Sequence, residues 1–270
     1  MIWLPAALVP RIMECCVVFI QVINLDRSEE RMAAIGAALE REGVAYSRLP
    51  ATDGRSLSAS DRILYSASRS ILYTGRRLKD SEIGCYISHV RAANAFLASG
   101  DNLGLVLEDD VKLPSDFSSR LQRLREIVDE MEAGSWEVGN LGKAPTPKYR
   151  KHVGTLDAEH EVVRAYRFPI RASAVLWTRQ GAARFVAEAY PIAAPVDVKI
   201  QVLATLSGKG VATVPELIPT SGAVSDIDPT GGPRKGQTRT GLSLPAAAMK
   251  IRQGVLRRVA RRNMRKAGTA

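Results

Sequence analysis

The chain has 270 residues, of which 46% are hydrophobic and 24% charged, a composition typical of a globular protein with one large or two small α/β domains. Its formal net charge is +10, yet residues 229–270 hold eleven of the 38 basic residues and none of the 28 acidic ones. The preceding 228 residues therefore carry a net charge of −1, which excludes a broad nucleic-acid footprint on the body of the protein.

The N-terminal segment "MIWLPAALVPRIMECC" is apolar, but it is short, contains two prolines and lacks the basic region of a secretory signal. No segment reaches the roughly 18–20 uninterrupted apolar residues of a membrane span. We expect residues 1–12 to be an added leader without a role in the fold. Three cysteines, Cys15, Cys16 and Cys85, can form neither a disulfide framework nor a zinc-binding spacing, which favours a reducing, cytoplasmic compartment.

The elements alternate between strands and helices along the chain. The β-branched, apolar run at 16–25 predicts a strand buried on both faces, and the following helix begins at Ser28 and ends at Gly43. Further strands are expected at 44–50, 103–107, 136–142 and 172–177, and helices at 81–99, 115–132, 178–190 and 191–208, with short helices or a mobile loop at 55–80. This alternation predicts an α/β fold with a mostly parallel sheet covered by helices on both faces.

Three consecutive carboxylates, Glu108, Asp109 and Asp110, follow the apolar strand in "LVLEDDV". Ligands of open α/β sheets bind beyond the carboxyl ends of the strands, and clustered carboxylates repel one another unless a cation neutralises them. Oxygen ligands suit Mn²⁺ or Mg²⁺. Because side chains alternate along a strand, Glu108 and Asp110 are the expected metal ligands and Asp109 should point to the other side. The alternative is a charged turn with solvated acids and a helix cap.

The segments "VINLDRSEERM", "SEIGCYISHVRA", "LVLEDDV" and "PVD", in this order, resemble glycosyltransferase family 25 over roughly residues 17–228. This family comprises lipopolysaccharide and lipooligosaccharide core galactosyl- and glucosyltransferases and is related to the collagen galactosyltransferase domains. The pairing of "EIGCYISH" with "LEDDV" is the specific part of the resemblance. "SDI" at 225–227 resembles the motif that closes the family's domain, whereas "EVGNLGK" after Trp136 departs from the family's usual pattern.

The resemblance implies a GT-A-like, Rossmann-type catalytic domain at 13–228, followed by a flexible linker and basic tail at 229–270. It also implies transfer of galactose or glucose, with inversion, from a UDP-sugar to a hydroxyl of a lipopolysaccharide or other glycan acceptor. The cofactor, Mn²⁺ or Mg²⁺, is predicted from the carboxylates and not from the resemblance, because the family varies in how clearly it shows a metal-binding Asp-X-Asp. The implied donor-binding residues are Asn24, Leu25, Arg27, Arg31, Asp53, Gly54, Glu82, Ser88 and His89.

Several of these residues have a plain structural alternative. Arg27 and Arg31 are either surface charges or contacts to the diphosphate. His89 is either a structural hydrogen-bonding residue of its helix or a residue of the pocket. An inverting transfer also needs a base, for which the candidates are Asp109, Asp110 and Asp197, although Asp197 could instead cap the helix that follows it. Cys85 is expected in the core, because nothing near it in sequence would lower its pKa.

The C-terminal tail combines basic residues with an expected apolar strip of Ala248, Ile251, Val255 and Val259 at helical spacing. A basic amphipathic helix fits an anionic membrane surface, so we expect a peripheral protein at the inner face of the plasma membrane. The alternative is a disordered, solubilising tail or a nonspecific nucleic-acid contact.

Two other functions fit parts of the sequence. A metal-dependent nucleotidyltransferase would also place carboxylates beside a nucleotide, but it should carry a glycine-rich phosphate loop, and "INLDRSEER" contains no glycine. A noncatalytic nucleic-acid-binding protein led by its basic tail disagrees with the near-neutral body, so no specific nucleic-acid partner is expected.

Overall fold

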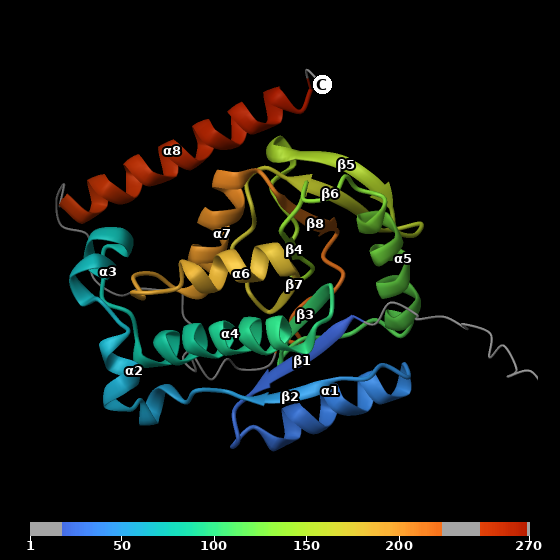
Figure 1. Ribbon diagram of the computed structural model, residues 1–270, viewed down its shortest axis with the longest axis horizontal. Helices are drawn as coiled ribbons and strands as arrows, with labels where there is room; N and C mark the ends of the chain where they lie inside the picture. The colour runs from blue at the N-terminus through green and yellow to red at the C-terminus, as the bar shows by residue number, and fades with distance from the viewer. Residues whose placement is uncertain (1–17, 223–243, 269–270) are drawn as a thin grey trace, which may run out of the picture.

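The computed structural model describes residues 18–222 and 244–268. Within these residues eight strands form one sheet in the order β2-β1-β3-β7-β4-β8-β6-β5 (Figure 1). The strands are β1 (Phe19–Asn24), β2 (Ser47–Pro50), β3 (Leu103–Glu108), β4 (Val138–Asn140), β5 (Arg150–Thr155), β6 (Glu161–Ala165), β7 (Ala174–Thr178) and β8 (Gly210–Val214).

The described helices are α1 (Glu29–Arg41), α2 (Ala59–Ile63), α3 (Ala67–Thr74), α4 (Asp80–Ser99), α5 (Phe117–Asp129), α6 (Arg179–Ala187), α7 (Val196–Ser207) and α8 (Leu244–Lys266), with 3₁₀ turns η1 (Gly54–Ser56) and η2 (Pro147–Tyr149). The predicted leader 1–12, the pair Cys15 and Cys16, the "SDI" motif and the linker at 229–243 lie outside the described residues.

The strand directions confirm the α/β fold. β2, β1 and β3 run parallel to one another, and the pairings onward from β7 show that, of the described strands, only β7 and β6 run the opposite way. The reversal at β7 was not predicted, and neither were the strands β5, β6 and β8. β5 carries "RKHVGT" at the sheet edge, where its side chains are largely exposed, so no apolar run marks it.

The central strands are apolar on both faces because helices cover both sides of the sheet. On β3, Val106 packs into a core with α4, α6 and α7, while Leu105 and Leu107 pack into a second core with α1 and α5. Successive side chains of a strand point to opposite faces, so an uninterrupted apolar run satisfies both cores. β3 therefore ends between two layers of helices, and the carboxylates that follow it emerge between α4 and α1.

Close backbone packing joins η1 to the beginning of α4 and explains two glycines of the sequence. A Cβ atom on Gly84 would lie 2.4 Å from the carbonyl oxygen of Thr52, and one on Gly54 would lie 2.5 Å from the backbone of Ser81. Ser88 holds the same junction, because its Oγ accepts a hydrogen bond from the Thr52 amide at 2.8 Å. The turn after β2 is thereby fixed against α4 at the edge of the sheet where β1 and β3 end.

Helix α8 packs against α3 and α7 on the body of the protein (Figure 1). Two residues of the predicted apolar strip, Ile251 and Val255, are 67% and 43% exposed, whereas the body of the protein covers Leu256 and Ala260, which the prediction did not include. The helix offers two apolar stripes, and the sequence pattern alone does not tell which of them the body covers. None of the helices that the structure describes is long and apolar enough to cross a membrane.

The Gly84 junction can be tested with a pair of glycine-to-alanine substitutions in helices. Gly84→Ala should lower the free energy of unfolding by about 1–3 kcal/mol, because the new methyl group overlaps the Thr52 carbonyl. Gly254→Ala in α8 is the matched control: its Cβ meets nothing within 4 Å, so the substitution should stabilise by up to about 1 kcal/mol through helix propensity. Urea unfolding measures both, and equal effects at the two sites would contradict the packing argument.

Candidate functional site

A cavity of about 430 Å³ lies at the carboxyl ends of β1 and β3, next to the η1–α4 junction. Residues with predicted roles that line it are Leu25, Arg27, Arg31, Asp53, Gly54, Ser88, Glu108, Asp109 and Asp110. Further lining residues for which the sequence predicted no role in the site include Arg55, Asp80 and Ser81. The structure therefore brings together segments that lie more than fifty residues apart in the chain. We call this the donor cavity, after the role that the sequence resemblance implies for its lining residues.

Glu108 points to the α4 side of the sheet. Its Oε1 lies 3.1 Å from His89 Nε2, and it accepts a weak hydrogen bond from Cys85 Sγ at 3.7 Å. Burial raises the pKa of Glu108, but the hydrogen bond and charge of His89 outweigh this and the pKa ends below its usual value. Glu108 is therefore an ionised carboxylate held in place by α4.

Asp109 points to the opposite side, toward α1. Its Oδ2 accepts a hydrogen bond from Asn24 Nδ2 at 2.6 Å, and its Oδ1 lies 3.4 Å from Arg31 Nη1. Burial raises the pKa of Asp109, and the Asn24 hydrogen bond and the Arg31 charge oppose that effect. The alternation predicted for Glu108 and Asp109 thus agrees with the contacts that each one makes.

Asp110 is the least neutralised of the three carboxylates. Its Oδ1 is buried and has no hydrogen-bond partner among the described residues, while its backbone carbonyl accepts from the Ser221 amide. Burial, followed by the negative charges of Glu108 and Asp109, raises the pKa of Asp110 to about 6. A buried oxygen with unused lone pairs is a ligand that suits a hard divalent cation. The potential metal-ligand atoms that lie within 4.8 Å of one another among the described residues are those of Cys85, His89 and Glu108.

Arginines line the same cavity as the carboxylates. Arg27 forms an ion pair with Asp53, whose Oδ1 also accepts a hydrogen bond from the Arg55 amide. Arg31 donates to Ser28 Oγ at 2.9 Å in addition to facing Asp109. The sequence could not predict the ion pair between Arg27 and Asp53, which lies in the turn after β2, because this contact depends on how β1 and β2 pair.

Four of the predicted site residues lie outside the lining of the donor cavity. Asn24 and His89 stand behind it, each in contact with a lining carboxylate. Glu82 was expected to bind the donor, but its carboxylate is 2.6 Å from both terminal nitrogens of Arg76 and also accepts from the Lys79 amide, which fixes the start of α4.

Asp197 is the fourth, and it lies in the first turn of α7. Its Oδ1 accepts from the Val198 amide at 2.8 Å. Its negative charge still acts on Cys85 in the cavity wall and on Arg76. Cys85, expected in the core, packs against the α4 side of the core and also contributes to that wall, four residues before His89 on α4. Burial and the charge of Glu108 raise the pKa of its thiol well above the usual value, which agrees with the prediction that it is no nucleophile.

The comparison with protein families matches residues 18–200 to the model described as glycosyltransferase family 25 (LPS biosynthesis protein). The chain belongs to glycosyltransferase family 25. The match contains the donor cavity with its three carboxylates, and it confirms the resemblance found in the sequence.

The relatives of this family-25 chain include an inactive protein and a galactosyltransferase. It is 34% identical over 128 residues to the inactive glycosyltransferase 25 family member 3 of Homo sapiens, a match that covers 45% of this chain and 21% of that protein. It is 31% identical over 126 residues to procollagen galactosyltransferase 1 of Danio rerio, again covering 45% and 21%. The chain thus spans about a fifth of the length of these relatives.

One solved structure is a distant match. It is described as a glycosyltransferase involved in the glycosylation of the major capsid of PBCV-1, and it shares 10% identity, with 62% of each chain covered and a TM-score of 0.30. At this TM-score the two sites are not compared.

The unneutralised charge of Asp110 leads to a prediction about stability. Its folded-state pKa of about 6 lies above the ordinary 3.8, so the unfolded chain releases the proton first and the native state loses stability as the pH rises between these values. In the absence of divalent cations, Asp110→Asn should therefore raise the free energy of unfolding near pH 7 by on the order of 1 kcal/mol. The gain should shrink as the pH falls toward about 4.

Urea unfolding at both pH values, with a chelator present, measures the effect. The control is Asp129→Asn, because Asp129 is 59% exposed in its pair with Arg125, and its loss should change stability by only a few tenths of a kcal/mol. A loss of stability near pH 7 on replacing Asp110 would show that the carboxylate is well solvated or paired.

Proposed function

We propose that the chain is a hexosyltransferase that moves galactose or glucose, with inversion, from a UDP-sugar to a hydroxyl of a glycan acceptor such as lipopolysaccharide. One observation carries the proposal: a family-25 chain holds three carboxylates at the end of β3, one of them with a free buried oxygen, in a cavity also lined by arginines. The relatives include both a galactosyltransferase and an inactive protein, so activity itself has to be tested.

The donor cavity offers both kinds of group that a nucleotide diphosphate requires. Arg27 and Arg31 are placed to contact phosphate oxygens, for which the guanidinium fork is well suited. Glu108 and Asp110 would hold Mn²⁺ or Mg²⁺, which when bound would stabilise the charge of the departing diphosphate. Its volume of about 430 Å³ is within the usual range for small-molecule sites.

The remaining polar residues position the reacting groups. Asn24 and Arg31 fix Asp109 on the α1 side, and His89 fixes Glu108 on the α4 side, so neither carboxylate is free to rotate away. With Asp110 engaged by a cation, the base that accepts the acceptor's proton must be another carboxylate. We assign this role to Asp197 in the first turn of α7, the remaining candidate once Asp110 binds a cation and Asp109 is held by Asn24 and Arg31.

The deciding experiment combines donor binding with single carboxylate variants. The protein should bind UDP or a UDP-hexose more tightly than ADP- or GDP-sugars in calorimetry, and hydrolyse the donor or transfer its sugar when Mn²⁺ is added. Asp110→Asn should lower kcat/KM roughly a thousandfold while the protein stays folded, because it removes a negative ligand of the cation that would stabilise the departing diphosphate.

Asp109→Asn should cost less than Asp110→Asn, because Asn keeps an acceptor for Asn24 and only the pair with Arg31 is lost. Asp129→Asn on α5 is the matched control and should be fully active. An Asp110→Asn protein with wild-type activity would remove the basis of the proposal, and an absence of activity in the wild type with intact UDP binding would indicate an inactive family member.

We also propose that α8 holds the protein at the anionic inner face of the plasma membrane, which implies a cytoplasmic, peripheral location. The docked helix leaves Ile251 and Val255 exposed, and Leu72 of the neighbouring α3 is 59% exposed. Exposed basic residues on the same helix are Lys250, Arg257, Arg258, Arg261, Arg262, Arg265 and Lys266. Each basic residue near an anionic bilayer adds about 1 kcal/mol at low salt.

Replacing Arg257, Arg258, Arg261 and Arg262 together by Gln tests the membrane proposal. These side chains are exposed, so the fold should persist while sedimentation with phosphatidylglycerol-containing vesicles falls about a hundredfold or more at low salt. Transfer to a soluble acceptor should be unchanged, because the donor cavity lies elsewhere. Unaltered vesicle binding by this variant would show that α8 is not the membrane contact.

A further inference from the structure

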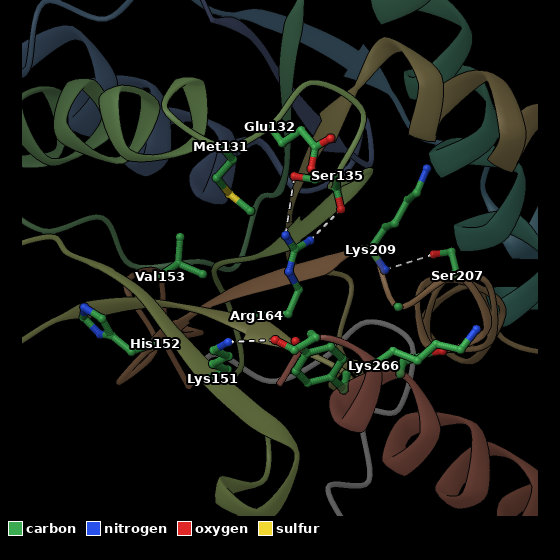
Figure 2. Close-up of a pocket in the computed structure, with 14 residues that line it drawn as sticks. Met131, Glu132, Ser135, Lys151, His152, Val153, Arg164, Ser207, Lys209 and Lys266 are labelled. Atoms are coloured by element: carbon green, nitrogen blue, oxygen red, sulfur yellow. Dashed lines mark hydrogen bonds between the residues drawn. The ribbon is translucent and has the colours of Figure 1, made fainter. Parts of the chain in front are cut away.

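A second cavity of about 640 Å³ lies at the other edge of the sheet, between the β5–β6 hairpin and the C-terminal ends of α7 and α8 (Figure 2). Lys209 in its wall directly precedes β8, and β8 runs parallel to β4 and in the same direction as β3. The wall therefore lies at the amino ends of these strands, away from the carboxylates that end β3. We call this cavity the Arg164 cleft, after the residue of β6 at its centre.

Arg164 carries a half-buried positive charge without a carboxylate partner among the described residues. Its Nη1 donates to the Ser135 carbonyl oxygen at 2.6 Å and its Nη2 contacts Ser135 Oγ at 3.4 Å, as Figure 2 shows. Burial lowers the pKa of the Arg164 guanidinium, which records that its charge is poorly solvated. A half-buried cation that is bonded only to neutral groups is costly, and an anionic ligand would relieve that cost.

Other basic side chains surround this guanidinium. Figure 2 places Lys151 on one side of Arg164 and Lys209 and Lys266 on the other, and all of them line the same cavity. Lys151 Nζ donates only to the Ala267 carbonyl oxygen at 3.0 Å, so it too lacks a carboxylate partner in the described part of the chain. Lys209 is paired with Glu137 at 3.3 Å.

The neutral lining is suited to a sugar. Ser135, Tyr166 and Asn263 contribute hydroxyl and amide groups, and Met131 and Val153 contribute apolar surface. One carboxylate, Glu132, also lines the cleft and can accept hydrogen bonds from sugar hydroxyls. The volume of about 640 Å³ admits a monosaccharide carrying a charged substituent.

We propose that the Arg164 cleft binds a phosphorylated saccharide, with the phosphate between Arg164 and Lys151. Arginine presents parallel N–H groups to phosphate oxygens, and the lysine adds a second positive charge. The proposal that a phosphate binds here is based on the residues of the cleft alone. The proposal that the phosphate belongs to a saccharide rests on the proposed function as a glycan-modifying enzyme. If the enzyme modifies glycans, the cleft binds a charged part of the acceptor that lies remote from the donor cavity. The binding energy of that charged part can then help retain the acceptor on the enzyme.

The test is binding by the full-length protein and needs no catalytic activity. In an NMR titration, inorganic phosphate and glucose 6-phosphate should shift the amide signals of Ser135 and Gly208, and glucose 6-phosphate should bind more tightly than either phosphate or glucose. Arg164→Gln should weaken binding about tenfold, and Arg164→Lys less, because lysine keeps the charge but not the fork. Lys151→Gln should weaken binding several-fold.

The control is Arg123→Gln, which removes the same charge from an exposed pair with Glu126 on α5 and should bind as the wild type does. A second arm measures binding to phosphatidylcholine vesicles with and without phosphatidylglycerol. If Arg164→Gln weakens vesicle binding and leaves glucose 6-phosphate binding unchanged, the cleft takes a lipid headgroup and the saccharide assignment is overturned. Phosphate-induced shifts confined to the donor cavity, or unaffected by Arg164→Gln, would overturn the site altogether, whatever the outcome of the transfer assays.

Discussion

The structure is organised around the mutual repulsion of three successive carboxylates at the end of a buried strand. The surroundings of the three carboxylates differ. Glu108 is hydrogen-bonded to His89 on α4, and Asp109 accepts a hydrogen bond from Asn24 and faces Arg31. Asp110 has a buried oxygen without a hydrogen-bond partner among the described residues. The helices on the two faces of the sheet are therefore also the two sources of charge compensation. The third carboxylate is compensated only in part, by the charge of Arg31, and it keeps a buried oxygen with unused lone pairs.

Helix α4 positions several of the residues that form the donor cavity. One end of it meets η1 through the close approach of Gly84 to Thr52, its first turn is fixed by the Glu82–Arg76 pair, and its middle supplies His89 to the carboxylates. These contacts lie on successive turns of the same helix. A shift of α4 along its axis would disturb all of them together, so the geometry of the donor cavity is tied to the packing of the core.

Local patterns predicted what depends on one or two neighbouring elements. The alternation along β3 separated Glu108 from Asp109, and the helix pattern placed Cys85 and His89 one turn apart on α4. What depends on pairing between distant segments was not predictable in this way: the β5–β6 hairpin, the Arg27–Asp53 pair, the role of Glu82 at the start of α4, and the face by which α8 docks. Arg164 had no sequence signal at all, because its surroundings come from β5, β6, α7 and α8.

The energetic cost of Asp110 bears on whether this family-25 chain is active or resembles its inactive relatives. A carboxylate whose pKa is raised to about 6 by burial and by two neighbouring negative charges destabilises the native state at neutral pH. Replacement by a neutral residue of similar size would relieve that cost, so a chain without a ligand for this site gains stability by losing the charge. A cation or a donor complex that binds only the native state would offset the cost by mass action. Under the proposed function, a ligand in the cavity lined by Arg27 and Arg31 would therefore offset the charge that the fold leaves largely uncompensated at Asp110.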